Sequence, residues 1–146
     1  MGDVIDERGR IIAGPRRDDG SFDDTVAVLR QGRMWQPPAA GEHNTVLVAV
    51  ATNAMLTKEQ ANRLATVCHD GLARAVRPAH TPSDGDTIFA LATGEVPVEP
   101  AGYRALEVIA SLAVERAIRR GVTTATSLGG VPAISELAPR PRRDSS

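Results

Sequence analysis

The sequence predicts an α/β fold on the basis of three observations. Two apolar runs rich in β-branched residues, 45–52 (TVLVAVAT) and 87–94 (TIFALATG), have the length of strands. A segment with helical periodicity follows each run, so strand and helix alternate along the chain. Aromatic residues make up only 3% of the 146 residues, and a core of small aliphatic side chains suits close packing of helices on a sheet.

The first elements expected along the chain are short. Apolar residues at 4–5 and 11–13 flank a turn-like DERG segment and predict a hairpin. Ser21 is expected to cap a short helix through residues 22–32. Residues 34–44 contain two prolines and show no periodicity, so they predict an exposed linker in which a chain can be cut.

The two apolar runs are expected to form strands that are buried on both faces, because neither alternates polar with apolar residues. Two long strands are fewer than the five or so of a usual sheet. Neighbouring strands are therefore expected from outside these 146 residues.

Both long helices carry recognisable end signals. Thr57 and Gln60 have the spacing of a capping box and predict a helix that ends before Pro78. Pro100 is expected in the first turn of a last helix, and Gly121 is expected to stop it.

Composition limits the classes of function. A formal net charge of −1 gives no indication of nucleic-acid binding. No apolar run reaches the roughly 18 residues that span a bilayer, and the N-terminus lacks the pattern of a signal peptide, so neither a membrane nor a secreted protein is expected. A single cysteine, Cys68, excludes an internal disulfide and fits a reducing cytoplasm, which is the predicted location.

No metal or cofactor is expected. The three histidines, His43, His69 and His80, do not show zinc-ligand spacing with Cys68. A phosphate-binding glycine loop and a dinucleotide fingerprint are both missing from the sequence. His80 lies close to an acidic loop and is a candidate substrate-binding residue, although it could simply form a hydrogen bond with that loop.

That acidic loop, Asp84-Gly85-Asp86, has two interpretations. It could be an ordinary polar turn in which Gly85 has a positive φ angle. A tight turn just before a strand can also direct two carboxylates at one point. A calcium-binding loop is excluded, because Ile88 and Phe89 stand where such a loop needs an oxygen ligand and a glycine.

Thr45, at the start of the first apolar run, also has two interpretations. It could be an ordinary strand-forming residue. It could also be a nucleophile that is activated when the chain is cut after Asn44. An α-amino group has a pKa of about 7.7 to 8.0, which is suitable for a general base. The amine freed on Thr45 would lie within reach of the hydroxyl of the same residue.

Three segments occur in the order and at the spacing of a known family. They read ATNAMLTKEQA, DGLARAVRPAHT and DGDTIFALATG, and a GDVID segment precedes them. With these segments the chain resembles the C-terminal half of the DmpA-type aminopeptidases, which include β-peptidyl aminopeptidases, L-aminopeptidase/D-amidase enzymes and nylon-oligomer hydrolases. The resemblance extends from about residue 2 to about residue 120.

The resemblance implies an N-terminal-nucleophile-like α/β/β/α sandwich, of which this chain is an incomplete portion. It implies self-cutting between Asn44 and Thr45, with Thr45 as the catalytic nucleophile. Asp84 and Asp86 match the two positions that orient the nucleophile and its amine. The implied activity is hydrolysis of amide bonds in small peptides or related amides through an acyl-enzyme, without a cofactor.

The resemblance also bears on domain organisation. Proteins of the family are more than twice as long, so residues 1–121 are expected to be the C-terminal portion of a hydrolase domain. Residues 122–146, which end in Pro, Arg and Ser, are expected to be a disordered tail. A family asparagine of the oxyanion hole and a family lysine fall upstream of the matching segments. The chain is therefore expected to form a homo-oligomer or to associate with the missing N-terminal portion; the alternative is a non-catalytic fragment or assembly subunit.

Overall fold

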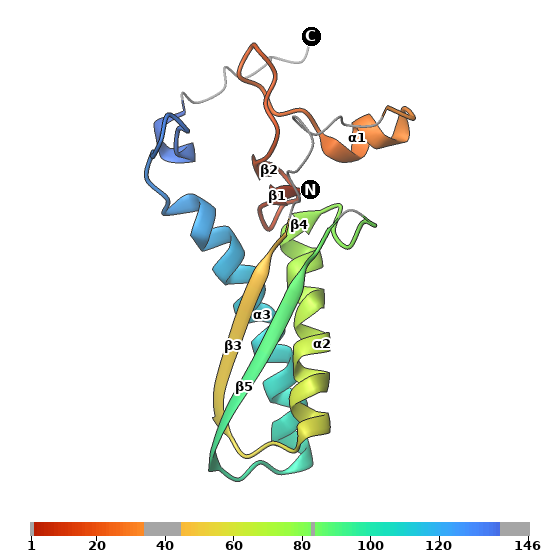
Figure 1. Cartoon of the computed structure of the whole chain (residues 1–146), viewed down its shortest axis with the longest axis vertical. Coiled ribbons are helices and arrows are strands. Elements are labelled where there is room, and N and C mark those ends of the chain that lie inside the picture. The colour runs from red at the N-terminus through yellow and green to blue at the C-terminus, as the bar shows by residue number, and fades with distance from the viewer. Residues whose placement is uncertain (1, 34–44, 83, 138–146) are drawn as a thin grey trace.

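The computed structural model describes residues 2–33, 45–82 and 84–137. Within them the elements are β1 (Asp3–Ile5), β2 (Ile11–Ala13), α1 (Thr25–Arg30), β3 (Leu47–Ala54), α2 (Lys58–Ala75), β4 (Val76–Arg77), β5 (Thr87–Val96), α3 (Pro100–Thr123) and a 3-10 helix, η1 (Ile134–Glu136). Strands β2, β1 and β4 form one small sheet, and β3 pairs with β5 in another. This mixture of helices and sheets agrees with the predicted α/β class (Figure 1). The expected linker at 34–44 and the last residues of the expected tail, 138–146, lie outside the described residues.

The predicted hairpin is confirmed, whereas the predicted cap of the first helix is wrong. Strand β1 pairs antiparallel with β2, and Ile5 lies opposite Ile11. Helix α1 begins after Asp24, whose carboxylate accepts a hydrogen bond from the backbone N–H of Ala27 at 3.0 Å. Ser21 lies further upstream in a turn, where its carbonyl accepts a hydrogen bond from the backbone of Arg17. Asp24 caps the helix because its oxygen is within reach of a free amide of the first turn.

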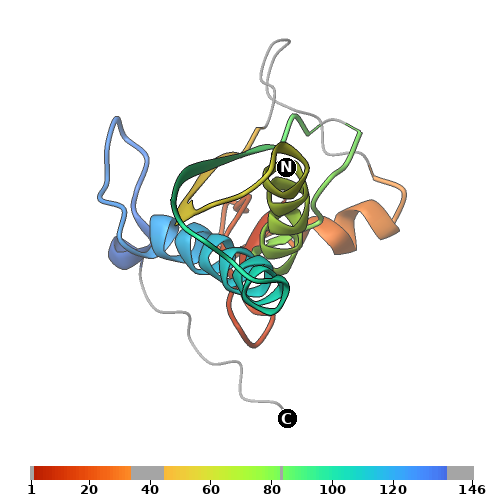
Figure 2. The same ribbon diagram turned by 90° about the horizontal axis from the view of Figure 1, so that it is seen from below.

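Strands β3 and β5 run parallel, and α2 lies in the connection between them (Figure 1). The prediction that both strands are buried on two faces is wrong. Their inner face packs on the core, while the outer face exposes large side chains, namely Leu47 (71% exposed), Phe89 (57%) and Leu91 (56%). The physical reason is that α2 and α3 lie on the same side of this sheet (Figure 2). No element within the described residues covers the other side.

The core lies between α2, α3 and the inner face of this sheet. Leu64, Cys68 and Leu72 of α2 are fully buried, and a buried leucine contributes roughly 1.5 to 3 kcal/mol. The capping box predicted for α2 is confirmed, because Thr57 and Gln60 exchange side-chain and backbone hydrogen bonds of 2.9 and 3.2 Å. Among the helices of the described ranges, none is apolar over enough length to cross a bilayer.

Gly71 lets α2 and α3 approach each other closely. A Cβ atom on Gly71 would collide with the backbone carbonyl of Ser111 and touch Val114. Gly71→Ala should therefore lower the free energy of unfolding by roughly 1 to 3 kcal/mol, as overpacking does, although alanine is the better helix former. The prediction that Gly121 stops the last helix is wrong, because α3 continues to Thr123. Gly121→Ala is therefore the matched control, since a Cβ there meets no atom within 4 Å. It should stabilise the protein by roughly 0.5 to 1 kcal/mol. Urea unfolding of both variants is the measurement, and a stabilised Gly71→Ala protein would contradict the close approach.

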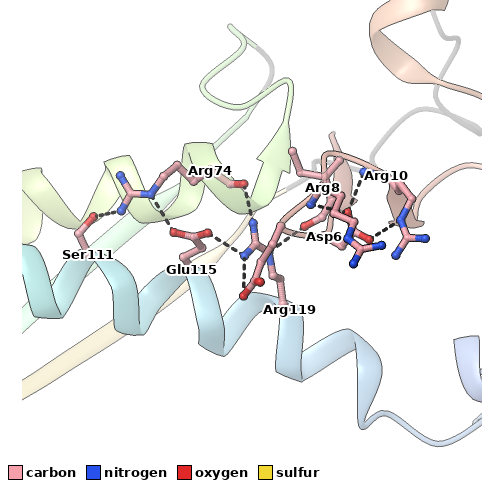
Figure 3. Close-up of polar contacts among 9 residues, drawn as sticks. Asp6, Arg8, Arg10, Arg74, Ser111, Glu115 and Arg119 are labelled. Carbon is pink, nitrogen blue, oxygen red and sulfur yellow. Dashed lines mark hydrogen bonds and ion pairs between the residues drawn. The ribbon is translucent and has the colours of Figure 1, made fainter.

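A polar network joins the two long helices to β1 (Figure 3). Glu115 forms ion pairs with Arg74 at 2.8 Å and with Arg119 at 2.7 Å. Arg74 also donates a hydrogen bond to the hydroxyl of Ser111 at 2.6 Å. Arg119 in turn donates from Nε to the carbonyl of Ile5 in β1 at 2.8 Å. One carboxylate and two guanidinium groups thus connect α2, α3 and the N-terminal strand.

Because of this network, the free energy of unfolding is expected to decrease at acid pH. Hydrogen bonding from Arg74 lowers the pKa of Glu115 below its ordinary 4.5, and the charge of Arg119 lowers it further. The unfolded chain therefore takes up the proton first as the pH falls, and the stability supplied by ionised Glu115 is lost below about pH 4.5. Urea unfolding should find the wild type more stable than Glu115→Gln near pH 7, with the difference narrowing below pH 4.5. A difference that stays constant from pH 7 to pH 3 would exclude ionised Glu115 as its source.

Candidate active site

Thr45 lies two residues ahead of β3. Both backbone polar groups of the next residue, Val46, form hydrogen bonds. The N–H of Val46 donates a hydrogen bond to Oδ1 of Asp86 at 3.0 Å. The carbonyl of Val46 accepts a hydrogen bond from the N–H of Thr87, also at 3.0 Å. Thr45 itself is exposed. The start of β5 therefore fixes the position of the residue after Thr45 and leaves the threonine accessible to solvent.

Gly85 lies directly against the hydroxyl of Thr45. A Cβ atom on Gly85 would be 2.8 Å from Oγ1 of Thr45, closer than a real Cβ approaches another atom. Gly85 is not one of the glycines with a positive φ angle, so the expectation of a positive φ angle at this residue is wrong. A glycine is needed here because the hydroxyl occupies the space of a side chain. Sequence reasoning missed this function of Gly85, and its position between two acidic residues was the only signal for it.

Asp84 is held by its own loop. Its Oδ2 atom accepts hydrogen bonds from the backbone N–H of Thr81 at 3.1 Å and from the Thr81 hydroxyl at 2.7 Å. Burial raises the pKa of Asp84, but electrostatic and hydrogen-bond interactions, including those from Thr81, outweigh burial and leave the pKa below its ordinary value. Asp84 is therefore negatively charged at neutral pH, which suits it to accept hydrogen bonds and to stabilise a nearby positive charge.

The three residues predicted to be catalytic, Thr45, Asp84 and Asp86, line one cavity of about 310 Å³. The other lining residues are contributed by β1 and the residue before it, by β4, by the start of the β3 segment and by the C-terminal part of α3: Gly2, Val4, Val46, Val76, Ile118 and Val122. The cavity therefore has a polar side, formed by a hydroxyl and two carboxylates, and an apolar side of valine and isoleucine. Residues nearly 40 positions apart in sequence form the polar side because β3 and β5 are parallel neighbours.

The remaining candidates do not join this cavity. His80 is not among its lining residues; Nε2 of His80 lies 2.9 Å from Nδ1 of His69. Cys68 is fully buried, and burial raises the pKa of its thiol, so it is a core residue and a poor nucleophile. Asn44 lies outside the described residues. In the part of the chain that the structure describes, no group of three or more His, Cys, Asp or Glu residues is arranged to hold a metal ion.

The chemistry available in the cavity is that of a hydroxyl between carboxylates. Among the residues that the structure describes, neither a histidine nor a lysine lines it. A carboxylate whose pKa is below its ordinary value, such as Asp84, is a weak base toward a hydroxyl. The hydroxyl of Thr45 therefore needs a base from elsewhere before it can act as a nucleophile.

Comparison with known proteins adds independent information. Residues 13–134 match the model of Peptidase family S58. The chain is 41% identical over 108 residues to an uncharacterized aminopeptidase of Mycobacterium tuberculosis, an alignment that covers 66% of this chain and 31% of the relative. It is 39% identical over 108 residues to an uncharacterized aminopeptidase of Mycobacterium leprae, covering 66% of this chain and 30% of that protein.

A second group of relatives is named for another activity. The chain is 30% identical over 112 residues to a 6-aminohexanoate-oligomer endohydrolase of Paenarthrobacter ureafaciens. This alignment covers 71% of this chain and 30% of the relative. The matched part thus corresponds to about a third of the length of these relatives.

Proposed function

Because this chain belongs to peptidase family S58, we propose that it is the nucleophile-bearing part of an amide-bond hydrolase. Membership confirms the resemblance to the DmpA-type aminopeptidases. The observation that carries the proposal is the accessible Thr45 hydroxyl in one cavity with Asp84 and Asp86. Two carboxylates beside a hydroxyl, with neither a histidine nor a lysine among the described lining residues, fit a nucleophile whose base is its own α-amine.

Activation begins with a cut of the chain before Thr45. The hydroxyl of Thr45 attacks the carbonyl carbon of Asn44, the peptide C–N bond breaks, and the Thr45 nitrogen takes up a proton to become a free amine. Water then hydrolyses the resulting ester, which ends the covalent link between residues 1–44 and 45–146. The free amine has a pKa suited to a general base at neutral pH.

Hydrolysis of the substrate follows in two steps. The amine accepts the proton of the Thr45 hydroxyl as its oxygen attacks the substrate carbonyl, and then gives that proton to the departing amine product. Water hydrolyses the acyl ester in the second step and restores Thr45. Asp84 stabilises the protonated amine by its negative charge, while Asp86 holds the N–H of Val46 and so fixes the nucleophile. No cofactor takes part in these steps.

The proposed substrates are small peptides or related amides. The names of the relatives, uncharacterized aminopeptidase and 6-aminohexanoate-oligomer endohydrolase, both refer to hydrolysis of amide bonds, and the second refers to an oligomer. A cavity of about 310 Å³ is at the lower end of the usual range for ligand pockets, roughly 300 to 1,000 Å³, and so suits a short substrate.

The proposal is tested by the mass of the purified protein. Self-cutting gives two fragments, and Edman sequencing of the larger one should start Thr-Val-Leu. Time-dependent appearance of these fragments at a rate independent of protein concentration would support cutting within one molecule. A chain that keeps its whole mass through prolonged incubation, both alone and with an added N-terminal portion from a relative, would contradict it.

A second candidate function is that of a non-catalytic assembly subunit. The observation that favours it is the exposed apolar outer face of the β3–β5 sheet, which carries Leu47, Phe89 and Leu91. In an α/β/β/α sandwich a second sheet would cover this face, and residues 1–121 would be the C-terminal portion of that domain. Association with such a portion, or a homo-oligomer, would bury these side chains. A subunit of this kind would bind the N-terminal portion yet remain uncut and without turnover.

A further inference from the structure

Arg119 contacts three elements at once although it lies on α3. Its side chain is only 15% exposed. Nε donates to the carbonyl of Ile5 at 2.8 Å, and Nη2 donates to the carbonyl of Arg74 at 3.3 Å. Nη1 pairs with Glu115, one turn earlier on α3, at 2.7 Å. The guanidinium thus bridges β1, the end of α2 and α3 (Figure 3).

The atoms that Arg119 holds adjoin the walls of the active-site cavity. Ile5 follows Val4, which lines the cavity from β1. Arg74 lies two residues before Val76, which lines it from β4. Ile118, the residue before Arg119, lines it from α3. One side chain therefore connects the backbones of three separate apolar walls.

The β1 wall is joined to the remainder of the cavity by a short strand ladder, by packing of Val4 against the core and by Arg119. Strand β1 pairs with β4 over two residue pairs only, Asp3 with Arg77 and Val4 with Val76. Besides this ladder, the hydrogen bond from Arg119 to Ile5 joins residues before position 44 to residues after it. Two longer ion pairs also cross this boundary. Arg77 lies 4.0 Å from Asp24, and Arg119 lies 4.0 Å from Glu7.

We propose that Arg119 is a positioning residue that keeps the β1 wall of the cavity in place once the chain is cut before Thr45. The proposal rests on the proposed function, because only a cut makes residues 1–44 a separate fragment. Without the covalent link, β1 stays on β4 and α3 through its short ladder, the packing of Val4 on the core and the guanidinium. Loss of this contact would open the part of the apolar side that Gly2 and Val4 form.

A lysine in place of Arg119 should restore only part of its contacts. The planar guanidinium meets two carbonyls and one carboxylate that lie in different directions. A lysine ammonium is a compact charge with a different geometry, so it can satisfy some of these acceptors and not all. Arg116 on the same helix offers a matched control, since it is exposed and its side chain makes no hydrogen bond or ion pair among the described residues.

The first test measures fragment retention without relying on self-cutting. In a Thr45→Ala background, a recognition site for a specific protease replaces residues 36–41 of the full chain, which is then cut and examined by native mass spectrometry. The fragment should stay bound with Arg119 intact and in Arg116→Gln. It should bind roughly tenfold or more weakly in Arg119→Gln, as loss of a charged hydrogen bond predicts, and to an intermediate degree in Arg119→Lys. Retention in Arg119→Gln equal to that in Arg116→Gln would overturn the proposal, provided that circular dichroism shows both variants folded.

The second test separates a positioning function from a merely structural one. With Thr45 present, Arg119→Gln should raise KM for a peptide anilide by roughly tenfold with a smaller change in kcat, because a wall of the binding cavity moves while the nucleophile stays. Arg119→Lys should recover part of the loss. Unchanged KM despite a lost fragment would show that Arg119 is structural only and would overturn the proposal. A lack of turnover in every protein would count against the proposed function, while the retention test would still decide whether Arg119 holds β1.

Discussion

Thr45→Ala should abolish both self-cutting and amide hydrolysis. The variant lacks the hydroxyl that attacks the Asn44 carbonyl and later the substrate, so turnover should fall on the order of 10⁶-fold, as it does when a nucleophile is removed. The fold should be unaffected, because Thr45 is exposed and Val46 keeps its hydrogen bonds to Asp86 and Thr87. Intact mass after purification and the rate of peptide-anilide hydrolysis are the two measurements.

Thr45→Ser is the matched control for this experiment. Serine keeps the hydroxyl and, after a cut, the α-amine, so cutting and turnover should both persist. If Thr45→Ala hydrolysed the anilide at the wild-type rate, the assignment of the nucleophile would be wrong. If it were cut before residue 45 but inactive, another residue would be responsible for the cut.

Gly85→Ala should strongly impair catalysis while leaving stability almost unchanged. A Cβ there would be 2.8 Å from the Thr45 hydroxyl and would push it out of its position. Displacement of a reacting group by about 1 Å costs roughly 10²-fold in rate. Because Gly85 is exposed, the free energy of unfolding should change by only about 0.5 kcal/mol. Steady-state hydrolysis and urea unfolding measured on the same preparation separate these two effects.

A double variant provides the control for the Gly85 prediction. Thr45→Ser removes a methyl group next to the added Cβ, because Cγ2 of Thr45 lies 3.8 Å from that position. The smaller serine can turn its hydroxyl back toward the substrate, so it should recover part of the activity of Gly85→Ala. Activity of the single Gly85→Ala variant that equals that of the wild type would show that the Thr45 hydroxyl does not need this space.

Much of the fold could be predicted because local signals agreed with tertiary packing. The capping box at Thr57 and Gln60 predicted the start of α2, and Pro100 predicted the start of α3. The first-helix cap was wrong because several acidic and hydroxyl residues stand close together there, and only the folded backbone shows that Asp24 is the one within reach of an amide. The prediction that β3 is buried on both faces was wrong, because apolar composition does not show whether a helix or sheet covers each face of a strand.

The candidate site was harder to predict from local pattern. Thr45 and Asp86 were recognised through family motifs, and their proximity follows from parallel pairing of β3 with β5. Arg119 could not be predicted at all, because its partners at Ile5 and Arg74 are backbone carbonyls far away in sequence, and any residue type supplies such a carbonyl. Gly85 was singled out for an expected positive φ angle, whereas the structure shows a close contact with Thr45. Both situations favour glycine, so the sequence alone does not distinguish them.

The fully buried Cys68 has a practical consequence. It is the one cysteine of the chain, and it lies in the core between α2 and α3. A thiol reagent can reach it only when the packing around it opens, so labelling kinetics under native conditions report how often this core opens. The protein thus contains its own probe of breathing motions, and the same assay can follow whether a bound substrate or a docked subunit slows them.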